Sequence, residues 1–437
     1  MCKTCHTAPK AGVSGKKVPE LDTLVENVAK KDFVRPSLSQ LRRVGGRLLG
    51  GRECQCGRAI IGSGSAVALV EGSDGTFYSG LQSCGNVWSC PVCQFKILEH
   101  RARTIKGIVH NALADNCRIG FVTLTVPHHA FQKLDDLRGL VTDSMRKIRQ
   151  SRYYRRMIGK DSIAGEFGVN EQTTLKLESR GRARSIPSVI LSRFKGDIRT
   201  LEVTHGKNGW HPHLHILFFA KCSEKQMEVF TREVFSLWAK QVEKAGFGKC
   251  SSKAFRYDAV KKDRNLADYL AKWDLAKEMT GSGSKQAKKS GRTPMQLLCE
   301  VAQSRNDSHP SSRLFREYAK AFKGKQKITI NGGLEREYLT TDAQLEAAMS
   351  DEKIAAEKQA GKVIGYLAKA VWRQVIISHW EDLVKAHAES GGMEEVTDVL
   401  NDLGVECYYD ISLMMVRAGP EKRTVKHPEF SICLPPP

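Results

Sequence analysis

No stretch of the 437-residue sequence stays apolar over the ~20 consecutive residues that a membrane-spanning helix needs. The N-terminal residues also lack the apolar core of a secretory signal peptide. We therefore expect a cytoplasmic protein that does not enter a membrane. In that reducing compartment, the 13 cysteines are expected to be metal ligands or free thiols rather than disulfides.

Acidic residues are scarce relative to basic ones, with 48 Asp and Glu against 69 Lys and Arg and a formal balance of +21. The deficit is uneven along the chain. Residues 331–437 carry 11 basic and 18 acidic residues, a balance of −7, which leaves +28 for the first 330 residues. Such a basic excess points to a polyanionic partner, and nucleic-acid phosphates are the usual one. Ribosomal contacts or anionic lipid fit the composition equally well, so charge alone does not identify the partner.

Histidines alternate with other residues in the segment Gly209–Phe219, which reads Gly-Trp-His-Pro-His-Leu-His-Ile-Leu-Phe-Phe. In an extended strand His213 and His215 project from one face, and two imidazoles there are half of a divalent-metal site. The strand expected just upstream, Asp197–Thr204, ends at a polar segment with glycines, which predicts an antiparallel hairpin with a long turn. Glu202 then lies beside the histidine pair and supplies a carboxylate. The alternative is a pair of surface histidines on an edge strand.

A group of cysteines precedes this hairpin. Cys90-Pro-Val-Cys93 has the spacing of a zinc knuckle, and Cys84 and Cys56 are near enough in sequence to complete a four-thiolate site. Cys54 is the rival to Cys56, but the glycine that follows Cys56 suits a tight turn better. Such zinc is architectural, since it closes a loop-rich segment that has little core of its own. The alternative is four reduced, packed cysteines.

A strongly basic helical stretch follows the expected strand Val122–Val126 and extends to about Met157. This stretch is either a solvated helix face or a DNA-contacting surface, and the sequence favours neither. The arginines expected to contact DNA in the second case are Arg146, Arg149, Arg152, Arg155 and Arg156.

Tyr269 and Lys272 are three residues apart in an expected helix, so their side chains share a face. Together with a metal-binding strand and a basic surface, they suggest transesterification of a phosphodiester. The metal would act as a Lewis acid on the scissile phosphate. Tyr269 would attack phosphorus, forming a 5′-phosphotyrosine and releasing a 3′-hydroxyl. Since a free tyrosine has a pKa of about 10, it needs help to ionise, and Lys272 can supply that help and hold the phosphate.

Tyr269 also has a simpler interpretation, as a helix-face aromatic that packs on the sheet. The sequence contains a second copy of the same four letters, Tyr366-Leu-Ala-Lys369. This copy lies in the acidic C-terminal region, far from the histidine hairpin in sequence. We therefore favour Tyr269 as the nucleophile and keep Tyr366 only if the C-terminal helices fold back onto the sheet.

Three motifs in this order resemble those of rolling-circle plasmid replication initiators in the HUH endonuclease superfamily. Phe121–Thr125 looks like the first motif, Glu202–His215 with its His-Leu-His core is similar to the second, and Asp268–Trp273 looks like the third. The block Cys84–Cys93 resembles a segment found ahead of the first motif in one initiator branch. The likeness covers about residues 54–300.

The resemblance implies a compact α+β domain with a Mg²⁺ or Mn²⁺ site and one catalytic tyrosine. It also implies nicking at a double-strand origin, as single-stranded or hairpin DNA, with a host helicase and DNA polymerase as partners. Some relatives place a glutamate four residues before the tyrosine, where it helps water to end replication. Here that position is Asn265, and the acids close to it are Asp263, Asp268 and Glu278. The roles of His205 and His211 stay open.

We expect an α+β fold in which a central antiparallel sheet is flanked by helices, preceded by a small zinc-binding segment and followed by a mainly helical C-terminal domain. The expected parts are a basic arm at 1–53, the zinc-binding segment with a helix at 54–110, the endonuclease domain at 111–282, a basic linker with helices at 283–344, and a helical accessory domain at 345–437. Two other functions fit: a single-strand transposase or conjugative relaxase with the same chemistry, and a non-catalytic zinc-containing DNA-binding protein.

Overall fold

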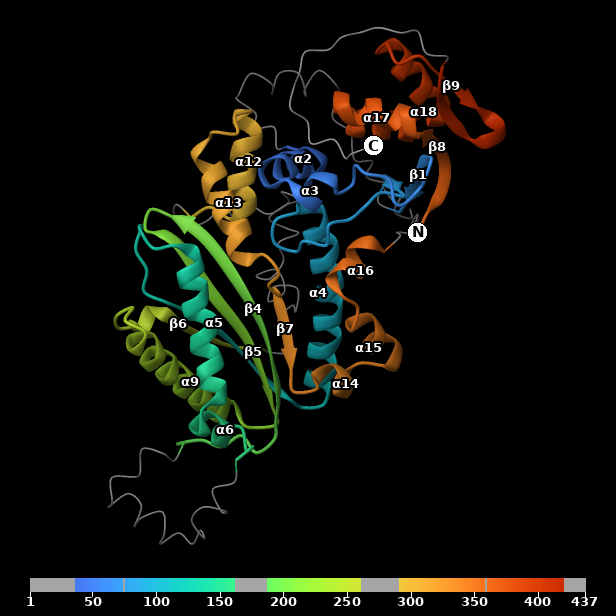
Figure 1. Ribbon diagram of the computed structural model, residues 1–437. Helices are drawn as coiled ribbons and strands as arrows, with labels where there is room; N and C mark the ends of the chain where they lie inside the picture. Colours follow the sequence, from blue (N-terminus) through green and yellow to red (C-terminus); the bar gives the residue numbers. More distant parts are fainter. Residues whose placement is uncertain (1–35, 74, 162–186, 261–290, 358–359, 420–437) are drawn as a thin grey trace, which may run out of the picture. The chain divides into compact units, whose positions relative to one another are not determined.

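Two five-stranded sheets with flanking helices make up the computed structural model, which confirms the expected α+β class (Figure 1). The structure describes residues 36–73, 75–161, 187–260, 291–357 and 360–419. The expected helix that carries Tyr269 and Lys272 lies outside these residues. Among the helices of the described ranges, none is both long and apolar enough to cross a membrane.

The first sheet contains the histidine hairpin and has the strand order β6-β3-β5-β4-β7, with every neighbouring pair antiparallel. Its strands are β3 (Arg118–Thr125), β4 (Phe194–Gly206), β5 (Gly209–Ala220), β6 (Phe255–Val260) and β7 (Ile328–Asn331). The predicted hairpin is present, but its turn is shorter than expected because Gly206 pairs directly with Gly209. Gly209 has a φ of +82°, and a Cβ there would lie 2.9 Å from the Cα of Ala130, so the tight turn requires a glycine.

Helices cover both faces of this sheet (Figure 1). On one face, α5 (Leu134–Gln150) and α9 (Glu224–Lys244) pack against side chains such as Val122 and Leu124. On the other, α4 (Pro91–Ala114) and α14 (Leu334–Tyr338) pack against alternate residues such as Phe121. The split follows from the two-residue period of a strand, which sends neighbouring side chains to opposite faces. The histidines share the face of Phe121, so they point to the side on which α4 lies.

The helix α9 has two local features that stabilise it, an N-terminal cap and a buried apolar stripe. The Ser223 hydroxyl accepts a hydrogen bond from the backbone N–H of Gln226, and the Gln226 side-chain oxygen accepts one from the backbone N–H of Ser223, which forms a capping box. The buried stripe of α9 includes Phe230, Val234 and Trp238 at helical spacing. The helix begins at Glu224, directly after this cap, and ends at Lys244.

The second sheet has the order β2-β1-β8-β10-β9. Its strands are β1 (Ala66–Gly72), β2 (Gly75–Ser79), β8 (Lys362–Ala368), β9 (Cys407–Asp410) and β10 (Met415–Ala418). Helices α17 (Lys369–Ser378) and α18 (Glu381–Asp402) pack on it around a core that includes Leu69, Leu367 and Trp372. Because β1 bonds to β8, residues 66–72 and the C-terminal residues form one sheet. The sequence did not predict β8, β9 or β10.

The second Tyr-x-x-Lys motif therefore has a different structure from the expected one. Tyr366 lies in β8, whereas Lys369 is the first residue of α17. The two side chains do not share a helix face.

The described ranges contain further helical elements besides those already named. They are α2 (Leu38–Leu49), α3 (Gly51–Gln55), α6 (Arg152–Met157), η3 (Ser252–Ala254), α12 (Pro294–Ser304), α13 (Pro310–Phe322), α15 (Thr341–Ala347), α16 (Asp351–Ala356) and η4 (Ile411–Leu413). Part of the expected N-terminal arm is thus the packed helix α2, in which Leu41, Val44 and Leu48 are buried.

Candidate functional site

Four buried cysteines meet at the start of α4. Cys90 is the N-cap residue of this helix and Cys93 lies in its first turn, while Cys84 and Cys56 come from the preceding loops. The Cys56 sulfur lies 3.6 Å from that of Cys90 and 3.5 Å from that of Cys93, and Cys84 lies 3.7 Å from Cys93. Four thiolates placed tetrahedrally about 2.3 Å from a zinc ion are about 3.8 Å apart. The cluster therefore fits a structural zinc ion, and it contains Cys56 rather than Cys54.

The protonation of these thiols points to the same ligand. Hydrogen bonds from Cys84, Cys90 and Cys93 hold the pKa of Cys56 far below its usual value. The same interactions, together with burial, raise the pKa of Cys90 well above its usual value. The pKa of Cys93 is lowered as well, whereas that of Cys84 is raised, so the thiols alone do not favour ionisation of all four. A bound cation removes that obstacle, because coordination deprotonates a thiol.

The hairpin strands and β3 bring a second set of polar groups together. In the β4–β5 register Glu202 pairs with His213 and Thr200 with His215, while on the other side of β5 Thr123 pairs with His215. Residues paired across an antiparallel ladder project from the same face. This histidine face, as we call the surface formed by Thr123, Thr200, Glu202, His211, His213 and His215, continues from the apolar layer that α4 covers.

Glu202 and His215 are in direct contact. The Glu202 Oε2 lies 2.9 Å from the His215 Nε2, and the His215 Nδ1 lies 3.0 Å from the Thr123 hydroxyl. Burial alone would raise the pKa of Glu202, but the hydrogen bond and charge of His215 outweigh it, so the pKa is lowered and the carboxylate is ionised. Two ligand atoms at right angles around an ion, each at about 2.1 Å, are about 3 Å apart. Glu202 and His215 therefore have the spacing of adjacent ligands.

His213 is on the same face, but its ring nitrogens are not close enough to both Glu202 and His215 for the three to form a compact ligand set. Its ring lies parallel to that of His215 with centroids 6.0 Å apart. Within the described ranges, the four cysteines are the only group of at least three His, Cys, Asp or Glu residues whose ligand atoms all lie within 4.8 Å of one another. Burial, with the neighbouring His211, lowers the pKa of His213 to about 3, so its ring is neutral and has a lone pair to donate.

A further histidine, His128, joins this face and was missed in the sequence. Its Nδ1 lies 3.1 Å from the carbonyl of Val126, which can only accept, so this nitrogen donates. In the neutral ring Nε2 is then an acceptor, and it lies 3.0 Å from the Nδ1 of His211. His211 thus donates to His128 and keeps a lone pair on its Nε2. The sequence feature that could have identified His128 is the segment Pro127-His-His, which directly follows β3, the strand that pairs with β5.

The arginines expected to contact DNA are separated from the histidine face, because α5 and α6 belong to the helix layer on the opposite side of the sheet. Arg146 and Arg155 form exposed ion pairs with Asp143 and Asp161. Arg149 pairs with the buried Asp197 at 3.6 Å, and Arg152 is exposed. Arg156 is only 7% exposed. Of the five, Arg146, Arg152 and Arg155 are the ones with guanidinium groups at the surface.

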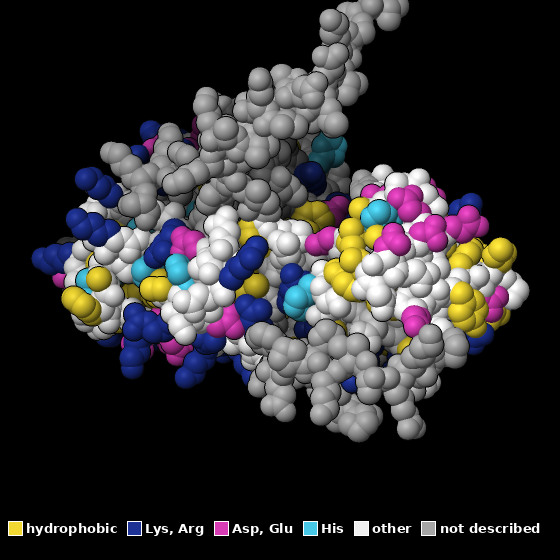
Figure 2. Space-filling view, turned by 90° about the horizontal axis from the view of Figure 1, so that it is seen from above, with side chains coloured by type: hydrophobic (Ala, Val, Ile, Leu, Met, Phe, Trp, Pro, Cys, Tyr) yellow, Lys and Arg dark blue, Asp and Glu magenta, His cyan; other side chains and the backbone are white. Residues whose placement is uncertain are grey.

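Surface charge is divided as the sequence indicates. Figure 2 shows many Lys and Arg side chains on one side of the view, and Asp and Glu side chains with exposed apolar ones on the other. Residues 381–418 carry nine acidic and two basic residues. This acidic part is therefore not suited to binding a polyanion.

Other residues named in the sequence lie outside the described residues. These are Tyr269, Lys272, Asp263, Asn265, Asp268 and Glu278. The described chain leaves the first sheet at Val260, which pairs with Ile119, and re-enters it at Arg292, which exchanges backbone hydrogen bonds with His205. Ile119 is near the start of β3, whereas His205 is near the end of β4, at the hairpin. Because β3 and β4 run in the same direction, Val260 and Arg292 lie at opposite ends of the sheet.

Similarity to characterised proteins covers a limited part of the chain. Protein rep of Streptomyces lividans is 30% identical over 159 residues, which are 35% of this chain and 33% of that protein. Neomycin resistance protein of Streptomyces cyanogenus is 31% identical over 162 residues, which are 36% of this chain and 32% of that protein. The chain thus spans about one third of the length of the curated relatives it matches. No protein-family model and no solved structure matches the sequence.

Proposed function

We propose that this protein is a plasmid replication initiator that nicks one DNA strand at a replication origin and later rejoins it, as in rolling-circle replication. The observation that carries the proposal is the adjacent placement of Glu202 and His215, with His213 on the same face of neighbouring strands. Partial similarity to a protein named Protein rep and the basic balance of the first 330 residues support it.

The proposed metal ligands are Glu202, His213 and His215. A Mg²⁺ or Mn²⁺ ion bound there would supply Lewis acidity to the scissile phosphate. The protein's own part is to keep Glu202 ionised, His213 neutral and His215 oriented between Glu202 and Thr123.

In the proposed reaction the Tyr269 oxygen attacks phosphorus. The new O–P bond forms as the bond from phosphorus to the 3′-oxygen breaks, the phenol proton is lost, and the 3′-oxygen takes up a proton. Lys272 stabilises the phenolate and holds the phosphate. The 5′-phosphotyrosine conserves the cleaved linkage, so a later hydroxyl can reseal the strand without ATP. The free 3′-hydroxyl primes a host DNA polymerase, with a host helicase opening the duplex.

A non-catalytic zinc-containing DNA-binding protein is the second candidate. The specific observation in its favour is that the four cysteines, not the histidines, form the complete ligand set among the described residues. The third candidate is a single-strand transposase or conjugative relaxase, which would use the same chemistry on a different DNA substrate.

The test uses supercoiled plasmid DNA carrying the region beside the coding sequence, with Mn²⁺ and purified full-length protein. We expect a strand-specific nick and a covalent protein–DNA adduct in the wild type and no adduct in Tyr269→Phe, with DNA binding retained. Tyr366→Phe is a matched control, since it alters the same four-letter motif in β8 and should leave the adduct unchanged. A normal adduct in Tyr269→Phe would remove this tyrosine from the mechanism, and the absence of any nick in the wild type would favour the non-catalytic candidate.

A further inference from the structure

Trp88 lies in the loop between Cys84 and Cys90, and the loop holds it firmly. The Asn86 side-chain oxygen accepts hydrogen bonds from the backbone N–H groups of Trp88 and Ser89 at 2.9 and 3.0 Å. The buried Gln94 in the first turn of α4 donates to the carbonyl of Val87 at 2.8 Å. Because Cys90 and Cys93 begin the same helix, the position of Trp88 depends on the cysteine cluster.

The Trp88 side chain in turn holds the segment that leads into β7. Its ring stacks on Phe322 with centroids 4.1 Å apart, and its indole N–H donates to the carbonyl of Lys325 at 2.6 Å. The ammonium group of Lys327 lies 4.9 Å from the centre of the same ring. Lys327 is 9% exposed, so this contact is made in a largely dry environment, where cation–π attraction is strongest.

The next residue, Ile328, begins β7 and pairs with Thr200 on β4. Thr200 is two residues before Glu202 and projects from the same face. β7 is a short edge strand of four residues, so it has few contacts of its own to fix its position. Trp88 is thus connected to the strand of Glu202 through Lys325, Lys327 and the β7–β4 ladder.

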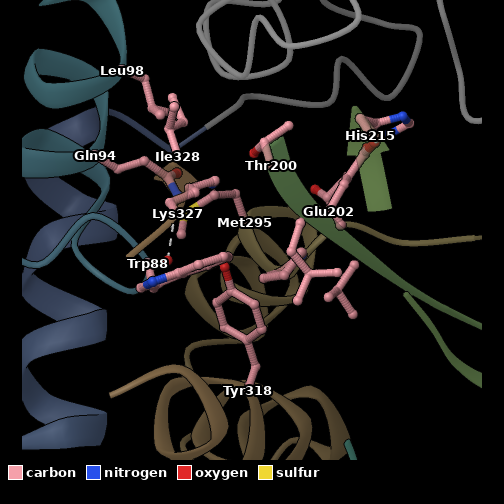
Figure 3. Close-up of a pocket in the computed structure, with 14 residues that line it drawn as sticks. Trp88, Gln94, Leu98, Thr200, Glu202, His215, Met295, Tyr318, Lys327 and Ile328 are labelled. Carbon is pink, nitrogen blue, oxygen red and sulfur yellow. Dashed lines mark hydrogen bonds and ion pairs between the residues drawn. The ribbon is translucent and has the colours of Figure 1, made fainter. Parts of the chain in front are cut away.

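A cavity separates the two groups. Trp88, Lys327 and Tyr318 line one side and Thr200, Glu202 and His215 the other (Figure 3). Its volume of about 40 Å³ is room for one or two water molecules, and a nucleotide base does not fit. Trp88 and Lys327 therefore do not form a base-binding pocket, and their effect on Glu202 must come through position and charge.

We propose that Trp88 is a positioning residue that couples the four-cysteine cluster to the metal-binding carboxylate of Glu202. The cluster fixes the Trp88 loop, Trp88 fixes the segment from Phe322 to Lys327, and this segment fixes the edge of the sheet beside Glu202. The inference rests on the proposed function in that it takes Glu202 as a metal ligand. It assigns the cysteine cluster a role in ordering the histidine face, in addition to holding its own loop.

The experiment compares Trp88→Ala and Trp88→Phe in the full-length protein, with Mn²⁺ as the probe. Mn²⁺ affinity is measured by electron paramagnetic resonance, zinc content by elemental analysis, and amide exchange in Leu201–Val203 by mass spectrometry. We expect Trp88→Ala to keep its zinc, to bind Mn²⁺ about 10-fold more weakly and to exchange faster in Leu201–Val203, as is usual when a residue supporting a ligand is removed. Trp88→Phe, which keeps the ring stacking, should recover most of the affinity.

Trp372→Ala is the matched control. Trp372 is a buried tryptophan of α17, the helix packed on the second sheet, and its indole N–H also donates to a backbone carbonyl, that of Arg58 at 2.7 Å. It should lower stability to a similar degree without changing Mn²⁺ affinity. Unchanged Mn²⁺ affinity and unchanged exchange in Trp88→Ala would overturn the proposal. If Trp88→Ala does not fold, Trp88→Leu replaces it in the same measurements. Leucine fills much of the volume of the indole but neither stacks on Phe322 nor donates a hydrogen bond, so the same outcomes are expected.

The amide-exchange measurement keeps the two proposals distinguishable. If the wild type binds no Mn²⁺ at this face, the proposed function fails. The rate of amide hydrogen exchange in Leu201–Val203 still tests whether Trp88 orders the strand of Glu202, because this rate is measured without metal or DNA. Faster exchange in Trp88→Ala with zinc retained supports the coupling, and equal exchange refutes it.

Discussion

Glu202 and His215 lie on neighbouring strands with Oε2 and Nε2 2.9 Å apart, and the Thr123 hydroxyl lies 3.0 Å from the other ring nitrogen of His215. The ionised carboxylate accepts, so the Nε2 of His215 carries a proton in this state. Metal binding through Nε2 requires that proton to leave, and a neutral ring then carries its proton on Nδ1. Thr123 is placed to accept it.

We therefore predict that Thr123→Val weakens Mn²⁺ binding about 10-fold, because the metal-bound tautomer loses the acceptor for its Nδ1–H. Thr123→Ser, which keeps the hydroxyl, should bind Mn²⁺ like the wild type. Titration calorimetry of the three proteins measures this. Equal affinity in Thr123→Val and the wild type would show that Thr123 does not orient a metal ligand.

The cysteine cluster predicts one tightly bound zinc ion per chain. Cys90→Ser and Cys93→Ser should lose the zinc and lower the melting temperature by about 5–10 °C, since structural zinc contributes directly to folding free energy. Cys54→Ser is the matched control, because Cys54 is also buried but lies outside the cluster. Elemental analysis and thermal melts check the prediction, and a zinc-free wild type would contradict it.

The histidine face predicts a pH dependence of stability. The pKa of His213 is about 3 in the folded protein because of burial, whereas an unfolded histidine titrates near 6.5. The unfolded chain therefore binds more protons between these values, so the free energy of unfolding falls as pH falls from about 6.5 toward 3.

Replacing the titrating ring should flatten this dependence. His213→Asn is expected to lose less stability than the wild type between pH 6.5 and 4, as measured by urea denaturation at several pH values. His129→Asn changes an exposed histidine near the same face and should keep the wild-type slope. Parallel slopes for His213→Asn and the wild type would show that His213 does not resist protonation.

The basic helices predict the salt dependence of DNA binding. If Arg146 and Arg152 contact phosphates, the double variant with Gln at both positions should reduce the slope of log affinity against log salt by up to about 2. Arg417→Gln, an exposed arginine of the acidic C-terminal part, should leave the slope unchanged. An unchanged slope in the double variant identifies this run as a solvated helix face.

Much of the first sheet was predictable because its signals are local. Alternating residues in the sequence marked β3 and β5. The pairing that builds the second sheet was not predictable, since β8 finds its partner β1 about 300 residues earlier in the chain. Lys369 begins a helix there, so a motif that reads as one helix turn is divided between a strand and a helix.

The sequence by itself determined the ligand types: four cysteines with zinc-knuckle spacing, and alternating histidines that share one face of a strand. Spacing along the chain was sufficient for these because the ligands come from one or two local elements. Only the tertiary structure settled the choice of Cys56 over Cys54 in the cluster, and only it showed that His128 and Trp88 adjoin the histidine face. Those relationships join strands and loops far apart in sequence, and packing of side chains, which has no local signature, sets them.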